Sequence, residues 1–245
     1  MKLTVLGSGG IRPDLRRAGP AHLLSEDGAH LLLDAGPGML RALLREGISA
    51  ADLRGLVVTH RHPDHVAELV LLLENECVRR RSAPLALAAP AILDAYLAFH
   101  AAWGRAAPKA LPYRIERHVL PGPARIGPFE IESRSVPHVE HSVGVAVRAR
   151  GRCLVYPGDC GPGAEVIELA RGADLLLIEC SLPAGERSAA HLAPADAAEI
   201  ALRAGVRRLV LTHFPPEADA ETAVAICRQR GLDVLAAEDG MQLEV

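Results

Sequence analysis

The stretch Thr59-His60-Arg61-His62-Pro63-Asp64-His65 carries three imidazoles and one carboxylate within six residues. It directly follows the apolar run of residues 53–58, which is typical of a buried strand. Imidazole nitrogen and carboxylate oxygen suit zinc, iron or manganese better than calcium or magnesium. His60 and His62 share a face of an extended backbone, whereas adjacent Asp64 and His65 must point in different directions. The stretch therefore predicts two metal positions, against the alternative of a polar loop whose histidines only satisfy hydrogen bonds.

Length and composition indicate a soluble globular protein. The chain has 245 residues, and although two small domains would also fit this length, we expect one large core and a single domain over residues 1–245. Hydrophobic residues make up 49% and charged residues 23%. A net charge of −3 and only 3% aromatic residues argue against a general nucleic-acid or membrane binder, because such partners require a basic surface and base stacking requires rings. A local basic patch is still compatible with these values.

Five cysteines are scattered along the chain without a Cys-x-x-Cys pair: Cys77, Cys153, Cys160, Cys180 and Cys227. Their odd number and spacing indicate reduced thiols in a cytoplasmic protein, not a disulfide framework. The apolar N-terminal stretch ends at residue 6, before a glycine-rich turn, and is too short for a signal peptide. No run approaches the roughly 20 apolar residues that a membrane-spanning helix needs, so we expect no membrane partner.

Apolar strand-like runs alternate with helical patterns along the chain. The first half predicts a hairpin closed by Asp27-Gly28, a helix over residues 39–46 and one continuous helix over residues 64–78. The second half predicts one strand over residues 126–135 and a helix over residues 194–204, and a final strand pair, 234–236 and 241–245, would close the chain around Asp239-Gly240. Four of the seven aromatic residues would form a small core, a lid over the site or a dimer surface: Tyr96, Phe99, Trp103 and Tyr113.

Four further donor residues share one local pattern. His60, His138, Asp159 and His213 each follow an apolar strand. In open sheets such strand ends converge on one edge, which is the usual place for a ligand site. A lone histidine after a strand is more often a hydrogen-bonded core or surface residue, but the dense loop at residues 59–65 requires partners. Together these positions predict a shared metal site.

The order of these residues resembles the metallo-β-lactamase superfamily over nearly the whole chain. Within it, five stretches are similar to the ribonuclease Z branch and its small phosphodiesterase relatives: Leu6-Gly7-Ser8-Gly9-Gly10 with Pro13 and Arg16 or Arg17, Leu33-Asp34-Ala35-Gly36, Tyr156-Pro157-Gly158-Asp159, residues 174–179 and residues 191–198. The resemblance implies an α/β fold, an αββα four-layer sandwich of two similar halves. Its metals would lie at the edge between the halves.

The resemblance also implies a set of seven ligands. One metal would be held by His60, His62 and His138, the other by Asp64, His65 and His213, and Asp159 would bridge them. His138 is preferred because the family's ligand stands six residues before a glycine, here Gly144, and His141 is the weaker candidate. Two divalent transition-metal ions are therefore expected, with zinc favoured and manganese or iron as alternatives.

Three other residues match positions around the family's metals. His191 matches a non-ligand histidine near the scissile group, where it would act as a general acid or contact the phosphate, although it could instead cap the helix that begins at Pro194. Asp34 and Glu179 are candidates for hydrogen bonding to ligand histidines. Asp64 would orient the attacking water or accept its proton.

Two departures from the ribonuclease Z pattern bear on the substrate. Cys160 stands where ribonuclease Z usually has threonine, which would leave the ligand set unchanged. Only 20 residues separate His138 from Asp159, where the transfer-RNA-processing enzymes insert a long basic arm. We therefore expect transfer RNA not to be the substrate.

The expected function is hydrolysis of small or cyclic phosphodiesters by a water activated between two metal ions. One alternative is a ribonuclease Z-type 3′ processing endonuclease. Others are hydrolysis of a thioester, lactone or β-lactam, and a non-enzymatic metal-binding module. The expected partner is a small phosphodiester, and the chain could form a homodimer.

Overall fold

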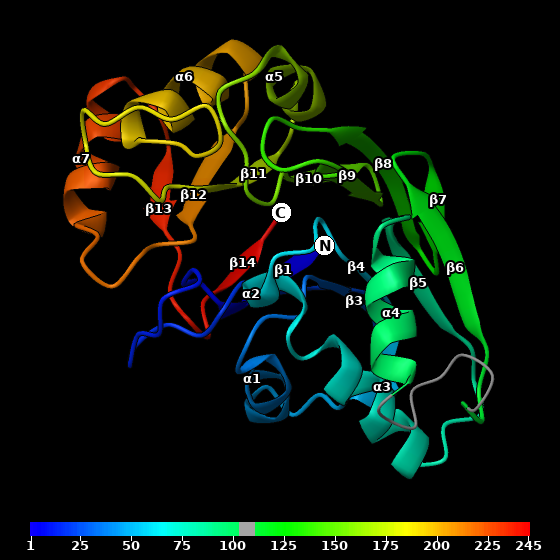
Figure 1. Cartoon of the computed structure of the whole chain (residues 1–245). Coiled ribbons are helices and arrows are strands. Elements are labelled where there is room, and N and C mark those ends of the chain that lie inside the picture. Colours follow the sequence, from blue (N-terminus) through cyan, green and yellow to red (C-terminus); the bar gives the residue numbers. More distant parts are fainter. Residues whose placement is uncertain (103–110) are drawn as a thin grey trace.

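Two mixed β-sheets lie face to face in the computed structural model, which describes residues 1–102 and 111–245, and helices cover the outer face of each sheet (Figure 1). In that part of the chain the first sheet has the order β14-β1-β2-β3-β4-β5-β6 and the second has the order β13-β12-β11-β10-β9-β8-β7. The first sheet comprises β1 (Lys2–Gly7), β2 (Ala21–Glu26), β3 (Ala29–Leu33), β4 (Leu53–Val57), β5 (Leu85–Pro90), β6 (Ile115–Leu120) and β14 (Gln242–Glu244). The second comprises β7 (Ala124–Ile126), β8 (Phe129–Ser135), β9 (Val143–Ala149), β10 (Arg152–Tyr156), β11 (Leu175–Glu179), β12 (Arg208–Thr212) and β13 (Val234–Ala236).

The helices fall into two groups, one for each sheet. The first sheet is covered by α1 (Met39–Arg45), α2 (Pro63–Val66), α3 (Leu69–Val78) and α4 (Leu93–Ala101), with the short 3₁₀ helix η1 (Ala50–Asp52) beside them. The second sheet is covered by α5 (Ala164–Ala170), α6 (Pro194–Ala204) and α7 (Ala220–Gln229). Within the described residues, no helix has the length and apolar character needed to cross a membrane.

Three hydrophobic clusters fill the spaces between these four layers. Along β10, Leu154 and Tyr156 belong to the cluster between the two sheets, whereas Cys153 and Val155 belong to the cluster beneath α5, α6 and α7. This alternation follows from the two-residue period of a strand. A third cluster packs the first sheet against α1, α3 and α4. The αββα sandwich expected from the resemblance is confirmed.

Several predicted elements are confirmed. The hairpin of β2 and β3 turns at Asp27 and Gly28, whose φ angles of 50° and 71° fit a two-residue hairpin loop. Helix α1 ends one residue before its predicted end, and α6 has the predicted bounds. Four described cysteines, Cys153, Cys160, Cys180 and Cys227, are buried free thiols, as expected.

The prediction of one continuous helix over residues 64–78 is wrong, because α2 and α3 are separate. The backbone N–H of Glu68 donates to the carbonyl of Ala35 at 2.9 Å instead of continuing α2. Its carboxylate accepts hydrogen bonds from the N–H groups of Gly38 and Leu40, both at 2.7 Å, at the start of α1. A contact with a segment about thirty residues earlier therefore ends α2.

Two other predictions need correction, and one strand was missed. The predicted single strand over residues 126–135 is wrong, because β7 and β8 form a hairpin over residues 124–135 in which Gly127 adopts a φ of 56° and Pro128 has no N–H to continue the ladder. The final strands do not pair with each other, since β13 pairs with β12 and β14 pairs with β1 in the other sheet. Strand β6 was not predicted, because its polar centre Glu116-Arg117-His118 hides the pattern of a sheet-edge strand.

Of the four aromatic residues expected to form a cluster, Trp103 lies outside the described residues, whereas Tyr96, Phe99 and Tyr113 lie within them. Tyr113 is buried and donates to the carbonyl of Leu73 at 3.0 Å, and Tyr96 donates to the carbonyl of Val66 at 3.2 Å. Phe99 is 61% exposed. Tyr96 and Tyr113 therefore attach this segment to α2 and α3.

Candidate metal centre

The candidate site lies where the carboxyl ends of parallel strands from both sheets meet. Strands β3, β4 and β5 are parallel in one sheet, and β10, β11 and β12 are parallel in the other. Asp34 follows β3, His60 follows β4 and its flanking residues, Asp159 follows β10, and His213 follows β12. The predicted convergence concerned His60, His138, Asp159 and His213, and the structure brings these four residues together, with His138 following β8.

The loop after β4 supplies donors in two backbone conformations. Thr59 anchors the loop, because its N–H and hydroxyl donate to the two carboxylate oxygens of Asp34 at 2.8 and 2.9 Å. His62 is extended, with φ −62° and ψ 143°, and Pro63 begins α2. Asp64 and His65 then lie in the first turn of that helix. Pro63 therefore separates the extended donors from the helical ones.

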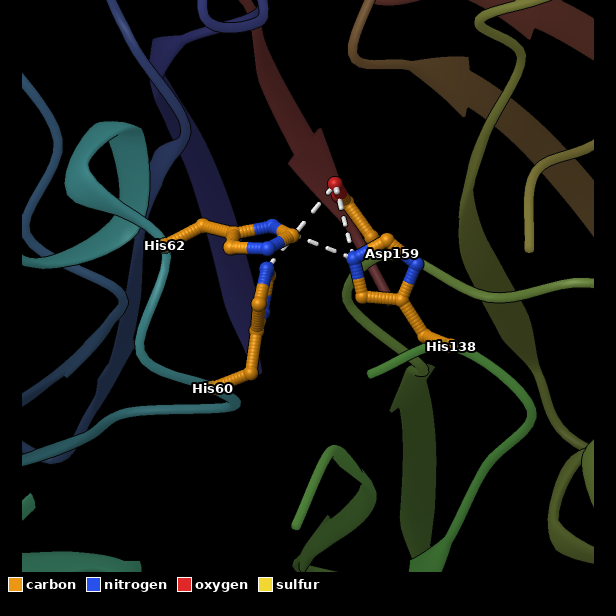
Figure 2. A group of neighbouring side chains, drawn as sticks. All are labelled: His60, His62, His138 and Asp159. Atoms are coloured by element: carbon orange, nitrogen blue, oxygen red, sulfur yellow. Dashed lines mark hydrogen bonds and ion pairs between the residues drawn. The ribbon is translucent and has the colours of Figure 1, made fainter. Parts of the chain in front are cut away.

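One group of side chains consists of His60, His62 and His138 around Asp159 (Figure 2). The Nε2 atoms of His60 and His138 each lie 3.9 Å from Oδ2 of Asp159. The Nε2 atom of His138 lies 3.2 Å from Nδ1 of His62. Figure 2 shows the three rings converging from two separate loops.

The second group consists of Asp64, His65 and His213 around the other oxygen of Asp159. Oδ1 of Asp159 lies 3.1 Å from Nε2 of His65 and 3.2 Å from Nε2 of His213. His213 Nε2 is also 3.3 Å from Oδ2 of Asp64. The two oxygens of Asp159 therefore face different groups, as expected of a carboxylate shared by two centres.

Four of the histidines are oriented by hydrogen bonds at Nδ1. The acceptors are Thr59 Oγ1 for His60 (3.0 Å), Asp34 Oδ2 for His65 (2.7 Å), the carbonyl of Ala190 for His138 (2.9 Å) and Ser181 Oγ for His213 (2.9 Å). The hydroxyls of Thr59 and Ser181 donate to carboxylates, so each must accept from its histidine. The proton is thereby held at Nδ1, and the lone pair of Nε2 points into the centre.

The chemistry of these donors fits divalent cations. Nε2 of His60, Nε2 of His65 and Oδ1 of Asp159 are buried without a hydrogen bond in the described residues. Burial would raise the pKa of Asp159, but His213 and His65 outweigh it and hold that pKa well below its usual range. Burial lowers the pKa of His60, which stays neutral. Unpaired buried donors of this kind are costly unless a cation satisfies them.

The charge of His65 depends on the same carboxylates. Burial alone would lower its pKa, but Asp159 and Asp34 outweigh burial and raise that pKa well above the ordinary value. Protonation of Nε2 of His65 would therefore compete with metal binding at that nitrogen. A metal ion would have to displace this proton, so binding should weaken in acid.

His191 lies beside the first group and stays accessible. Its Nδ1 donates to Oε1 of Glu179 at 2.8 Å, and its ring centre lies 4.9 Å from that of His138. Its side chain is 32% exposed, and the hydrogen bond to Glu179 raises its pKa. Asp159, Glu179 and His191 also lie close enough to hold an ion themselves. His191 Nε2 is the nitrogen that can reach a substrate.

Other candidates from the sequence are placed as follows. Asp34 accepts from His65 and from the Tyr156 hydroxyl at 2.8 Å, whereas Glu179 contacts His191 and Ser181. His141 points outward, with 48% of its side chain exposed, and pairs with Glu140. Ser181 and the carbonyl of Ala190 were missed, because no local pattern marks a residue that only orients another.

The glycine-rich turn after β1 packs against this site. A Cβ added to Gly10 would lie 2.9 Å from Cε1 of His213. The carboxylate of Asp239 accepts hydrogen bonds from the N–H and hydroxyl of Ser8, at 2.9 and 2.8 Å, and holds the turn in place. Gly10 is therefore required here by close approach to a candidate ligand.

Comparison with known proteins identifies relatives along the whole chain. The family model described as "Beta-lactamase superfamily domain" matches residues 29–214. Ribonuclease Z of Mycobacterium sp. (strain KMS) is 33% identical over 266 residues, which cover 94% of this chain and 92% of that protein. The metallo-β-lactamase fold protein YhfI from Bacillus subtilis superposes with a TM-score of 0.88 at 24% identity, covering 100% of this chain and 99% of YhfI. A diphosphatase of the PhnP family superposes with a TM-score of 0.79 at 24% identity, covering 100% and 97% of the two chains.

These matches agree with the geometry of the site. The range matched by the family model includes all seven candidate ligands, from His60 to His213. The structural likenesses at 24% identity support the fold, and the ribonuclease Z match extends the likeness to sequence. The chain therefore belongs to the metallo-β-lactamase superfamily, in its ribonuclease Z-like branch.

Proposed function

We propose that this hydrolase binds two divalent transition-metal ions and cleaves small or cyclic phosphodiesters. The observation that carries the proposal is the position of Asp159, whose two oxygens face separate groups of donors. His60, His62 and His138 would hold one ion, and Asp64, His65 and His213 the other. Nitrogen-rich sets of this kind favour zinc, with manganese or iron as alternatives.

The residues of this chain would divide the chemistry between them. Two ions held there would supply Lewis acidity at a phosphoryl oxygen and lower the pKa of a water. Asp64 would orient that water or accept its proton. The hydrogen bond to Glu179 raises the pKa of His191, which would donate a proton from Nε2 to the leaving oxygen.

The interval between His138 and Asp159 supports a small substrate. Strands β9 and β10 occupy most of these 20 residues and are joined by a tight turn at Arg150 and Gly151. This interval therefore contains no long RNA-gripping arm. The likeness to a PhnP-family diphosphatase is a further reason to favour attack at phosphorus over attack at a carbonyl carbon.

A ribonuclease Z-type 3′ processing endonuclease is the second candidate. Identity of 33% across 94% of the chain favours it and makes our expectation against transfer RNA doubtful. The two candidates differ in the size of the substrate they accept. Specific activity on a cyclic phosphodiester and on precursor transfer RNA, with one metal-loaded preparation, separates them. Site-specific trimming of the precursor 3′ end would favour the second.

Metal content and a substrate screen test the main proposal. We expect about two zinc ions per chain by elemental analysis and turnover of bis(p-nitrophenyl) phosphate. A thioester, a lactone and a β-lactam serve as carbonyl controls, because the same metals could polarise a carbonyl. Trace metal after zinc or manganese is supplied would refute the dinuclear site. Turnover of only a carbonyl control would refute phosphodiester cleavage, and metal without any turnover would indicate a metal-binding module.

A further inference from the structure

A groove of about 640 Å³ lies beside the candidate metal centre, between the loop after β1 and helix α1. Its charged lining is mostly basic, with two aspartates, Asp14 and Asp239, and five arginines: Arg12, Arg16, Arg17, Arg41 and Arg45. The chain as a whole carries a net charge of −3. Positive charge is thus concentrated locally, in a protein whose overall charge would repel an anion.

Two glycines that line the groove lie close to residues of the candidate metal centre. Gly10 lines the groove, and a Cβ added there would lie 2.9 Å from Cε1 of His213. Gly19 also lines it, and a Cβ added there would lie 3.3 Å from the carbonyl oxygen of Asp64. In Figure 1 the loop after β1 runs beside α2 and above α1. The groove therefore lies next to the segments that carry His213 and Asp64.

Three of the arginines are committed to protein contacts. Arg17 donates to Ser8 Oγ and to the carbonyl of Ala237, both at 2.6 Å, and its guanidinium lies 4.9 Å from the centre of the Phe214 ring. Arg12 pairs with Glu217, and Arg16 with Asp14. These contacts shape one wall of the groove.

The other two arginines have no such contacts. Arg41 and Arg45 are exposed on α1 and make no hydrogen bond or ion pair within residues 1–102 and 111–245. They are four positions apart, so both face the groove, and like charges at this spacing repel each other on a helix. An anion between them would relieve the repulsion and accept hydrogen bonds from both guanidinium groups.

We propose that Arg41 and Arg45 bind a second phosphate of the substrate, beyond the phosphodiester that is cleaved. This inference rests on the proposed function and narrows its substrate to nucleotide-like phosphodiesters with an additional phosphate. Guanidinium is suited to this contact because its planar donors match phosphate oxygens. If the two arginines were only solvated, the protein would not distinguish a ligand that carries this second phosphate from one that lacks it.

Calorimetric titration of the zinc-loaded protein tests the proposal without requiring turnover. The ligands are uridine 3′-monophosphate and uridine 3′,5′-bisphosphate, which contain no phosphodiester and differ by one phosphate. We expect the bisphosphate to bind about tenfold more tightly, the size of one charge-assisted contact. The double variant Arg41→Gln/Arg45→Gln should reduce this preference to less than about threefold.

A matched control removes two positive charges elsewhere. Arg79 and Arg80 are exposed and do not line the groove, so Arg79→Gln/Arg80→Gln should keep the tenfold preference. Equal binding of both ligands by the unmodified protein, or an unchanged preference in the groove variant, would overturn the inference even if bis(p-nitrophenyl) phosphate is hydrolysed. Conversely, an arginine-dependent preference in a protein that hydrolyses no phosphodiester would support the groove and refute only the proposed function.

Discussion

Asp34→Asn should weaken zinc binding although Asp34 belongs to neither group of candidate ligands. Asp34 is fully buried and accepts four hydrogen bonds, from the Thr59 N–H and hydroxyl, His65 Nδ1 and the Tyr156 hydroxyl, at 2.7 to 2.9 Å. Three of these meet at Oδ2. An amide whose oxygen takes the place of Oδ2 turns its NH₂ toward the Thr59 N–H, so at least one hydrogen bond is lost.

The expected magnitudes follow from this count. One unsatisfied buried N–H lowers the free energy of unfolding by about 1–3 kcal/mol. The three remaining hydrogen bonds lose their charged acceptor, which lowers stability further. Removal of a buried negative charge offsets part of this loss. We expect a loss of about 2–4 kcal/mol in the free energy of unfolding of the metal-free protein. Because His65 loses its charged partner, zinc affinity should fall by about 10- to 100-fold.

Competition with a chromophoric chelator measures the zinc affinity, and urea unfolding measures stability. Asp174→Asn is the matched control, because Asp174 also accepts a backbone N–H and arginine hydrogen bonds but lies at the opposite end of β11 from the site. It should leave zinc affinity unchanged. If Asp34→Asn binds zinc within about threefold of the unmodified protein, the orienting role inferred for Asp34 is wrong.

Two further perturbations test other parts of the site. His62→Ala should lose zinc and activity together, whereas His191→Ala should keep its zinc and lose activity by roughly 100-fold, the usual size of a general-acid contribution; zinc loss in His191→Ala would refute its non-ligand role. Burial lowers the pKa of His22 from 6.5 to about 3, so only the unfolded chain gains this proton as the pH falls below 6.5, and stability present above that pH is lost in acid. Between neutral pH and pH 5.0, the free energy of unfolding measured with urea should therefore fall by about 2 kcal/mol less in His22→Phe than in the unmodified protein. Equal losses in the two proteins would contradict the lowered pKa of His22.

Local sequence was sufficient for elements whose determinants lie within a few residues. Asp27 and Gly28 could be assigned to a hairpin turn because Asp-Gly favours the positive φ angles that a two-residue turn requires, and both residues adopt them. Pro63 could be placed at a helix start, and the donors around it could be identified as candidate ligands by their chemistry and spacing. These inferences depend on covalent geometry and on neighbours in the chain.

Long-range packing determined the rest. Residues 64–78 have a helical pattern, but α2 ends where Glu68 forms hydrogen bonds to Ala35 and to the start of α1. The last two strands have the pattern of a strand pair, but they lie in different sheets. Hydrogen bonds from Ser181 and Ala190 set the ring orientations of His213 and His138, and nothing near those histidines in sequence indicates them.

The role of Asp159 depends on both local sequence and tertiary packing. Its place after an apolar strand made it a candidate, but the separation of its two oxygens between donor groups depends on how the two sheets pack. Periodicity and turn chemistry act over a few residues, whereas the edge between the sheets is set by burial of side chains from both halves of the chain. Arg41 and Arg45 likewise line a groove with Arg12, Arg16 and Arg17 only because that packing brings α1 beside the loop after β1.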